Sequence, residues 1–168
     1  MGVMKKRWIS LYVENQVGVL SKISGLFSAK SYNLESLTVG TTEDSTVSRM
    51  TIGVNSDDVT YEQIKKQLNR MVEVIKVIDL EFIPAHMKEL LYARINNCKP
   101  DKMTELFHIA QAFDVKVVDI GIDTAILESV QTEARNNELV ELLKIKFKSI
   151  DIVRGGNVEI ESISITDR

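Results

Sequence analysis

Residues 7–54 read RWISLYVENQVGVLSKISGLFSAKSYNLESLTVGTTEDSTVSRMTIGV, and their hydrophobic pattern decides the fold. The first eight residues alternate and place Ile9, Leu11 and Val13 on one face, which predicts a strand with a single buried face. Apolar residues then recur at helical spacing through residues 19–30, which predicts an amphipathic helix. A strand therefore passes directly into a helix through a short polar turn.

Two further strands and a second helix follow that helix. Residues 33–40 and 47–54 favour extended structure, and the polar turn TTEDST between them predicts a hairpin. Thr60 and Gln63 have the spacing of a capping box, and residues 74–82 predict a closing strand. The second helix is marked by four apolar residues, Ile64, Leu68, Met71 and Val72. The order β-α-β-β-α-β predicts an α+β, ferredoxin-like domain with two helices on one face of an antiparallel sheet.

The same order begins again after Pro84. Residues 88–96 predict a strand, Pro100 opens a helix, and residues 115–121 and 124–130 predict a second hairpin. The unit closes with a helix bearing Leu139, Leu142, Leu143 and Phe147 and with strands near residues 150–153 and 157–165. We therefore expect two tandem ferredoxin-like domains, residues 1–83 and residues 84–168.

Composition narrows the class of partner. The chain has 168 residues and a formal net charge of -3, which gives no global field to attract nucleic acid or an anionic membrane. No apolar run approaches the roughly 20 residues that span a bilayer, and the first residues lack a signal-like apolar core. One cysteine, Cys98, excludes an internal disulfide. We expect a cytoplasmic protein with no nucleic-acid and no membrane partner.

Groups for catalysis are scarce. The two histidines, His86 and His108, are far apart in sequence, and no HExxH, GxSxG, CxxC or P-loop spacing is present. A stand-alone small enzyme is therefore a weak alternative, because catalytic groups must converge. RNA binding is another, because RNA-recognition domains share the β-α-β-β-α-β order, but the strand VSRMTIGV offers no aromatic side chains for stacking. We expect no catalytic residue and no bound metal or cofactor.

The first turn has the groups needed to bind a free amino acid. Free backbone N–H groups gather where Asn15–Gly18 enters the helix, and they can receive a carboxylate with help from the helix dipole. Gly18 lets a ligand approach the backbone closely. The side chains of Asn15 and Asn33 could accept from an ammonium group. The alternative is that Asn15 caps the helix and Gly18 only makes a turn.

The stretch VENQVGVLSKISGLFSAKSYNLESLTVG, with SRMTI and EQIKKQLNRMVEVIKVIDL, closely resembles the regulatory small subunit of acetohydroxyacid synthase, also called acetolactate synthase. The resemblance covers nearly all of residues 8–81 and implies that the first domain is an ACT domain. KVVDIG and DIVRGGNVEI resemble segments of the family's second domain, but a glycine usual after the middle hairpin is replaced within ESVQTEARNN.

The resemblance implies a partner, the catalytic large subunit, which this chain would activate and make sensitive to feedback inhibition by valine or another branched-chain amino acid. Thiamine diphosphate, Mg and FAD are expected on that partner. The family's effector residues lie in the first turn and at the next strand, which assigns effector binding here to Asn15, Gln16, Val17, Gly18, Val19 and Asn33. Val17 stands where the family often has proline. The alternative is an ACT-type amino-acid sensor that regulates a different enzyme.

A homodimer is also expected, formed through the first domains. Small domains with an open sheet edge gain from association. Valine would then bridge two domains, with its carboxylate at Gly18 and its ammonium near Asn33 of a neighbouring chain.

Overall fold

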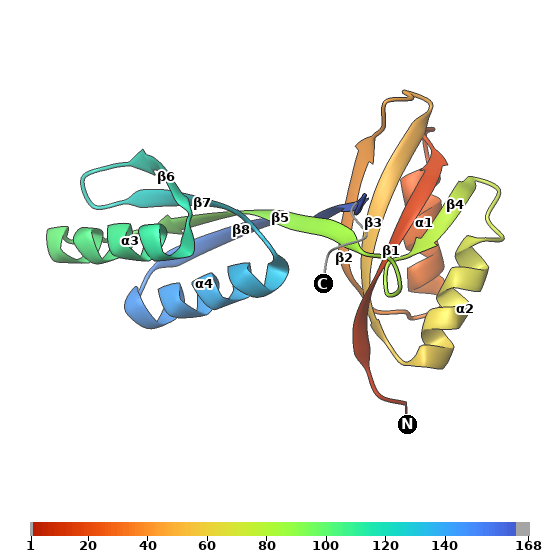
Figure 1. Cartoon of the computed structure of the whole chain (residues 1–168), viewed down its shortest axis with the longest axis horizontal. Coiled ribbons are helices and arrows are strands. Elements are labelled where there is room, and N and C mark those ends of the chain that lie inside the picture. Colours follow the sequence, from red (N-terminus) through yellow and green to blue (C-terminus); the bar gives the residue numbers. More distant parts are fainter. Residues whose placement is uncertain (1, 164–168) are drawn as a thin grey trace. The chain divides into compact units, whose positions relative to one another are not determined.

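A computed structural model of the chain describes residues 2–163 and contains two compact units (Figure 1). Met87–Asn157 forms the second unit, and the first unit comprises residues 2–86 together with residues 158–163. Each unit has one four-stranded sheet. The separate roles of the two predicted domains stay predictions.

The first unit has the predicted β-α-β-β-α-β order. Its elements are β1 (Lys5–Glu14), α1 (Val19–Ala29), β2 (Leu34–Thr41), β3 (Val47–Ser56), α2 (Asp58–Leu68) and β4 (Val74–Asp79). The strands lie in the antiparallel order β2-β3-β1-β4, which leaves β2 and β4 as the edges. Figure 1 shows α1 and α2 on the same face of this sheet. The predicted ferredoxin-like fold is confirmed.

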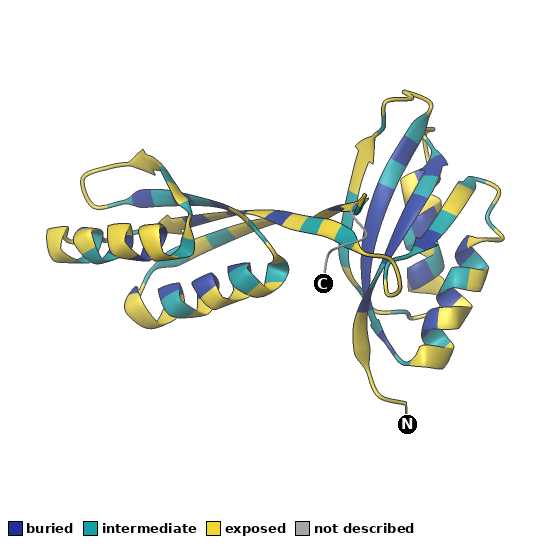
Figure 2. Cartoon of the chain, viewed as in Figure 1, coloured by how far each residue is buried: buried dark blue, intermediate teal, exposed yellow. Residues whose placement is uncertain are grey.

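The core of the first unit lies on the face predicted from β1. Ile9, Leu11 and Val13 are fully buried, and Ile9 pairs with Ile52 across the sheet. Ile23 of α1 packs into the same cluster. The buried bands of β1 and β3 in Figure 2 mark this central pair of strands. The period of two in the sequence therefore corresponds to burial against the helices.

One detail of α2 differs from the prediction. The helix is capped by Asp57, whose carboxylate accepts a hydrogen bond from the backbone N–H of Thr60 at 2.8 Å, so the capping box at Thr60 is wrong. An aspartate at the N-cap satisfies the same free donors and lets the helix begin earlier. The helix ends at Leu68, and Val72 lies beyond it in an exposed position.

The second unit repeats the order with its own core. Its elements are β5 (Ala85–Ile95), α3 (Pro100–Phe113), β6 (Lys116–Ile120), β7 (Ala125–Gln131), α4 (Glu133–Lys146) and β8 (Ile150–Glu161). The first two residues of β5 and the last four of β8 belong to the first unit. The strands lie in the order β6-β7-β5-β8. Pro100 is the first residue of α3, as predicted. Residues buried in one cluster include Leu91, Leu127, Leu139 and Leu143.

The last two strands expected in the second half are one continuous strand. β8 runs through both Gly155 and Gly156, which lie between the two expected strands. Gly156 has a φ of 81°, a left-handed conformation that glycine adopts at little cost, so the strand continues through it. Residues 164 and 165 of the expected strand lie outside the described residues.

Candidate functional site

The turn between β1 and α1 is built around Gly18. This residue is the N-cap of α1 with φ 91° and ψ -13°, in the left-handed region that favours glycine. A Cβ atom added to it would meet no other atom within 4 Å. The backbone conformation therefore favours a glycine here, and the space beside its Cα atom is open.

The N-terminus of α1 is available to an anion. Among the described residues, no side chain caps this helix, and its first turn carries no acidic residue. The N–H of Val19 donates to the carbonyl oxygen of Gln16 at 3.3 Å, a long hydrogen bond. The uncapped N–H groups and the positive end of the helix dipole together favour a carboxylate.

Asn15 lies in the turn but does not cap α1. Its side-chain amide donates to the carbonyl oxygen of Ser45 at 2.8 Å, and its side-chain oxygen accepts from the Ser48 hydroxyl at 3.0 Å. Its backbone N–H donates to the carbonyl oxygen of Thr46 at 2.7 Å. Because Gly18 is the N-cap, the alternative in which Asn15 caps the helix is wrong.

The remaining turn residues differ in exposure. Asn15, Gln16, Val17 and Gly18 are exposed, and Val17 stands fully in solvent. Val19 is buried in the core of the first unit, so only its backbone can reach a ligand. The structure thus brings five of the six predicted effector residues together in one turn.

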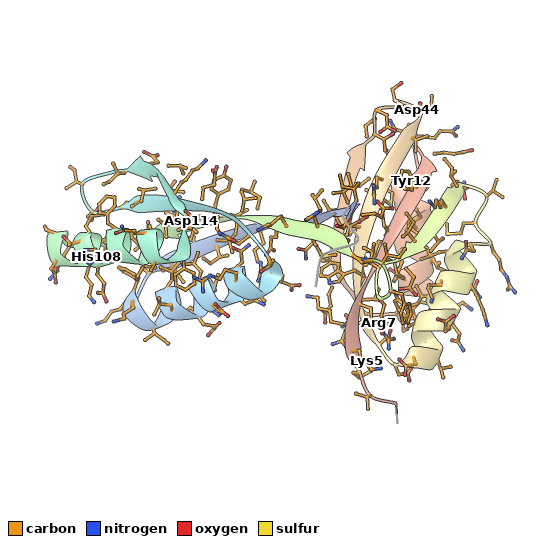
Figure 3. The ribbon with its side chains drawn as sticks, viewed as in Figure 1. Lys5, Arg7, Tyr12, Asp44, His108 and Asp114 are labelled. Atoms are coloured by element: carbon orange, nitrogen blue, oxygen red, sulfur yellow. The ribbon has the colours of Figure 1, made fainter. Side chains whose placement is uncertain are left out.

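Asn33, the sixth residue, lies at the opposite end of the sheet. It is exposed and precedes β2, whose first residue pairs with Val54, whereas the last residue of β1, before the turn, pairs with Val47. These two positions on β3 are separated by about 23 Å, at roughly 3.3 Å per residue. Figure 3 shows the two ends, with Asp44 of the β2–β3 loop at one and Arg7 at the other. One chain therefore does not bring Asn33 to the turn.

Two acidic side chains near the turn are engaged by neighbours. A hydrogen bond from Lys22 holds the pKa of Glu73 below its usual value. Hydrogen bonds from the hydroxyl and the N–H of Thr46 likewise lower the pKa of Asp44. Both carboxylates therefore stay ionised at neutral pH in these contacts.

The sequence did not indicate that the β2–β3 loop and the start of β3 contribute to the site. Ser45, Thr46 and Ser48 all bond to Asn15, although they lie about thirty residues further along the chain. The polar turn TTEDST predicted the hairpin, but no local pattern indicated that its tip meets the first turn.

Within residues 2–163, no group of three or more His, Cys, Asp or Glu side chains is placed to hold a metal ion. Both His86 and His108 are exposed. In the same range, no helix combines the length and the apolar character needed to cross a bilayer.

Two family models match almost the whole chain. The AHAS small subunit-like ACT domain matches residues 9–76, and the small subunit of acetolactate synthase matches residues 88–163. The acetolactate synthase small subunit of Aquifex aeolicus is 38% identical over 157 residues, which cover 94% of this chain and 81% of that protein. A probable acetolactate synthase small subunit of Archaeoglobus fulgidus is 37% identical and covers 91% and 94% of the two chains.

Structural similarity agrees with the sequence matches. The crystal structure of the acetolactate synthase small subunit from Thermotoga maritima has a TM-score of 0.84 and 29% identity, and covers 96% of this chain and 99% of that one. The shared fold extends over both units, as the family models do. The chain belongs to the family of acetolactate synthase small subunits and is a regulatory, non-catalytic subunit.

Proposed function

We propose that this chain joins the acetolactate synthase large subunit, raises its activity, and makes it sensitive to feedback inhibition by valine or a related branched-chain amino acid. The observation that carries the proposal is the open, uncapped N-terminus of α1 at Gly18. Thiamine diphosphate, Mg and FAD belong to the large subunit in this proposal. The present chain supplies only the sensor.

The chemistry of the turn suits a small aliphatic amino acid. The N–H groups at Gly18 receive the carboxylate, and the side-chain oxygen of Asn15 has a second lone pair for the ammonium. The exposed side chains of Val17 and Leu20 lie beside these groups in sequence and offer apolar surface to the ligand. None of these groups carries a charge that could pair with a charged side chain of an effector.

The position of Asn33 favours a site completed by a second chain. β2 is an edge strand with unpaired backbone groups, so two copies can join their sheets there. In an antiparallel twofold pairing of β2 with β2, the start of one strand meets the end of the other. Asn33 of the partner subunit then lies at the same end as the turn at Gly18.

The first prediction is a homodimer in solution. The open edge of β2 and an effector site that needs two chains both favour association. Light scattering at micromolar concentration is expected to give twice the chain mass of 19.0 kDa. A mass that stays at 19.0 kDa over this range argues against the shared site.

The second prediction concerns the partner enzyme and tests the proposed function. Purified chain alone is expected to form no acetolactate from pyruvate, whereas mixing it with the large subunit encoded in the same genome raises the rate of that subunit. The measurement is the initial rate as a function of added chain, with sedimentation to follow assembly. A partner whose rate and sedimentation do not change on mixing rejects the proposal.

Inhibition must then come from a difference in affinity between two states of the complex. A ligand shifts an equilibrium only by binding one conformation better than another. Coupling free energies of about 1–3 kcal/mol are typical and correspond to roughly 5–150-fold in affinity. Occupancy of a site shared by two chains stiffens their interface, which changes how the dimer holds the large subunit.

A further inference from the structure

The side-chain amide of Asn15 is held at both of its polar ends. Its nitrogen donates to the carbonyl oxygen of Ser45 at 2.8 Å, and its oxygen accepts from the hydroxyl of Ser48 at 3.0 Å. Rotation of the amide by half a turn would exchange donor and acceptor and break both bonds. The two partners therefore fix which way the amide faces.

The loop that supplies the first of these partners, Ser45, is itself ordered by Asp44. Its carboxylate accepts from the N–H of Thr46 at 2.9 Å and from the hydroxyl of the same residue at 2.6 Å. The hydroxyl of Thr42 donates to the carbonyl oxygen of Asp44 at 3.0 Å. Figure 3 shows Asp44 at the tip of this hairpin. These hydrogen bonds hold the loop in one conformation beside the exposed turn.

Ser48 differs from the loop residues because it is buried. It lies on β3, opposite Val13 of β1, and only 6% of its surface is exposed. Most buried hydroxyls in proteins are hydrogen-bonded, and the Ser48 hydroxyl has Asn15 as its partner. This hydrogen bond connects the start of β3 to the turn between β1 and α1.

We propose that Ser48 is a positioning residue of the effector site: its hydroxyl fixes the Asn15 amide so that one N–H and one lone pair face the bound amino acid. This rests on the proposed function, because it assumes that the effector binds at the turn. An α-amino acid has an acceptor and a donor on adjacent groups. The fixed Asn15 amide can bond to both of these groups. Because the amide is already ordered, no conformational entropy of its side chain is lost when the ligand binds.

The test is a valine titration of acetolactate formation by complexes that contain single variants of this chain. Ser48→Ala is expected to raise the inhibition midpoint by about 2- to 10-fold, the range that corresponds to one hydrogen bond. Ser48→Thr keeps the hydroxyl and is expected to restore most of the wild-type midpoint.

Ser56→Ala is the matched control. Ser56 is also a buried serine of β3, but its hydroxyl has no hydrogen-bond partner among the described residues. Its removal is expected to leave the midpoint unchanged. Equal shifts for Ser48→Ala and Ser56→Ala would show a general effect on the sheet and overturn the positioning role.

Gly18→Asp in the same titration separates the two proposals. If Gly18→Asp removes inhibition and Ser48→Ala keeps the wild-type midpoint, the role of Ser48 is overturned and the effector site stands. If Gly18→Asp also keeps the wild-type midpoint, or the wild-type complex is not inhibited by valine, both proposals are overturned.

Discussion

Complexes that carry Gly18→Asp are expected to keep forming acetolactate at valine concentrations that inhibit the wild-type complex. A Cβ atom at Gly18 would meet no other atom within 4 Å, so the new side chain can project into the space proposed for the ligand. Its negative charge also competes for the N–H groups at the start of α1 and repels the carboxylate of valine. Both effects lower the affinity of the site for valine.

The fold is expected to tolerate this change. Aspartate is among the residues that adopt left-handed backbone conformations most readily, and an acidic group is favourable at a helix N-terminus. Gly18 has φ 91°, so some strain remains, but assembly with the large subunit should survive. Sedimentation of the mixed subunits checks this point.

Two variants separate the causes of the loss. Gly18→Asn adds the same bulk without charge and is expected to weaken inhibition less than Gly18→Asp. Asn33→Ala removes one proposed polar contact, worth about 0.5–1.5 kcal/mol, and should also have a smaller effect. A Gly18→Asp complex that assembles and is inhibited with the wild-type midpoint would place the effector elsewhere.

Glu89→Leu is expected to lower the free energy of unfolding of the second unit. Glu89 is 4% exposed, and its two carboxylate oxygens accept from Arg154 at 2.7 Å each. The pair raises the pKa of Arg154. The amide of Asn136, fully buried in α4, donates to the same carboxylate at 3.1 Å.

Removing this carboxylate takes two acceptors from the Arg154 guanidinium and one of two acceptors from the Asn136 amide, which also donates to the backbone carbonyl oxygen of residue 89 at 3.3 Å. The expected cost is about 2–4 kcal/mol, below that of a fully buried pair because the side chain of Arg154 is 34% exposed and keeps contact with water. Glu89→Leu combined with Arg154→Met should recover part of the loss, because no unpaired charge remains. Urea unfolding followed by circular dichroism measures both.

The Arg94–Asp151 pair provides the control for Glu89→Leu. Its side chains are 55% and 53% exposed, so Asp151→Asn is expected to leave the unfolding midpoint close to that of the wild type. Trp8 is the only tryptophan and lies in the first unit, so its fluorescence should follow a transition that Glu89→Leu does not move. Equal losses of unfolding free energy for Glu89→Leu and Asp151→Asn would contradict the stabilising role of the buried Glu89–Arg154 pair.

The order of elements could be predicted from the sequence because it depends on local periodicity. The alternation through Ile9, Leu11 and Val13 predicted the buried face of β1, and Pro100 predicted the start of α3. Errors arose where two local signals competed. Asp57 rather than Thr60 caps α2, since both residue types favour that position.

The site was harder to predict because its contacts join residues that are distant in sequence. Asn15 could be assigned to the effector turn, but its bonds to Ser45 and Ser48 depend on strand register. The stretch ESVQTEARNN, which departs from the family pattern, holds Ser129 and Asn136, whose side chains bond each other at 2.6 Å. None of these three contacts can be predicted from the spacing of the residues along the chain.

The most direct test of the central claim is binding of L-valine to the purified chain, measured by equilibrium dialysis for the wild type and for Gly18→Asp in parallel. We expect saturable binding to the wild-type chain and none to Gly18→Asp over the same concentration range. Equal binding by the two chains, or none by the wild type, would contradict the assignment of the turn Asn15–Gly18 as the sensor.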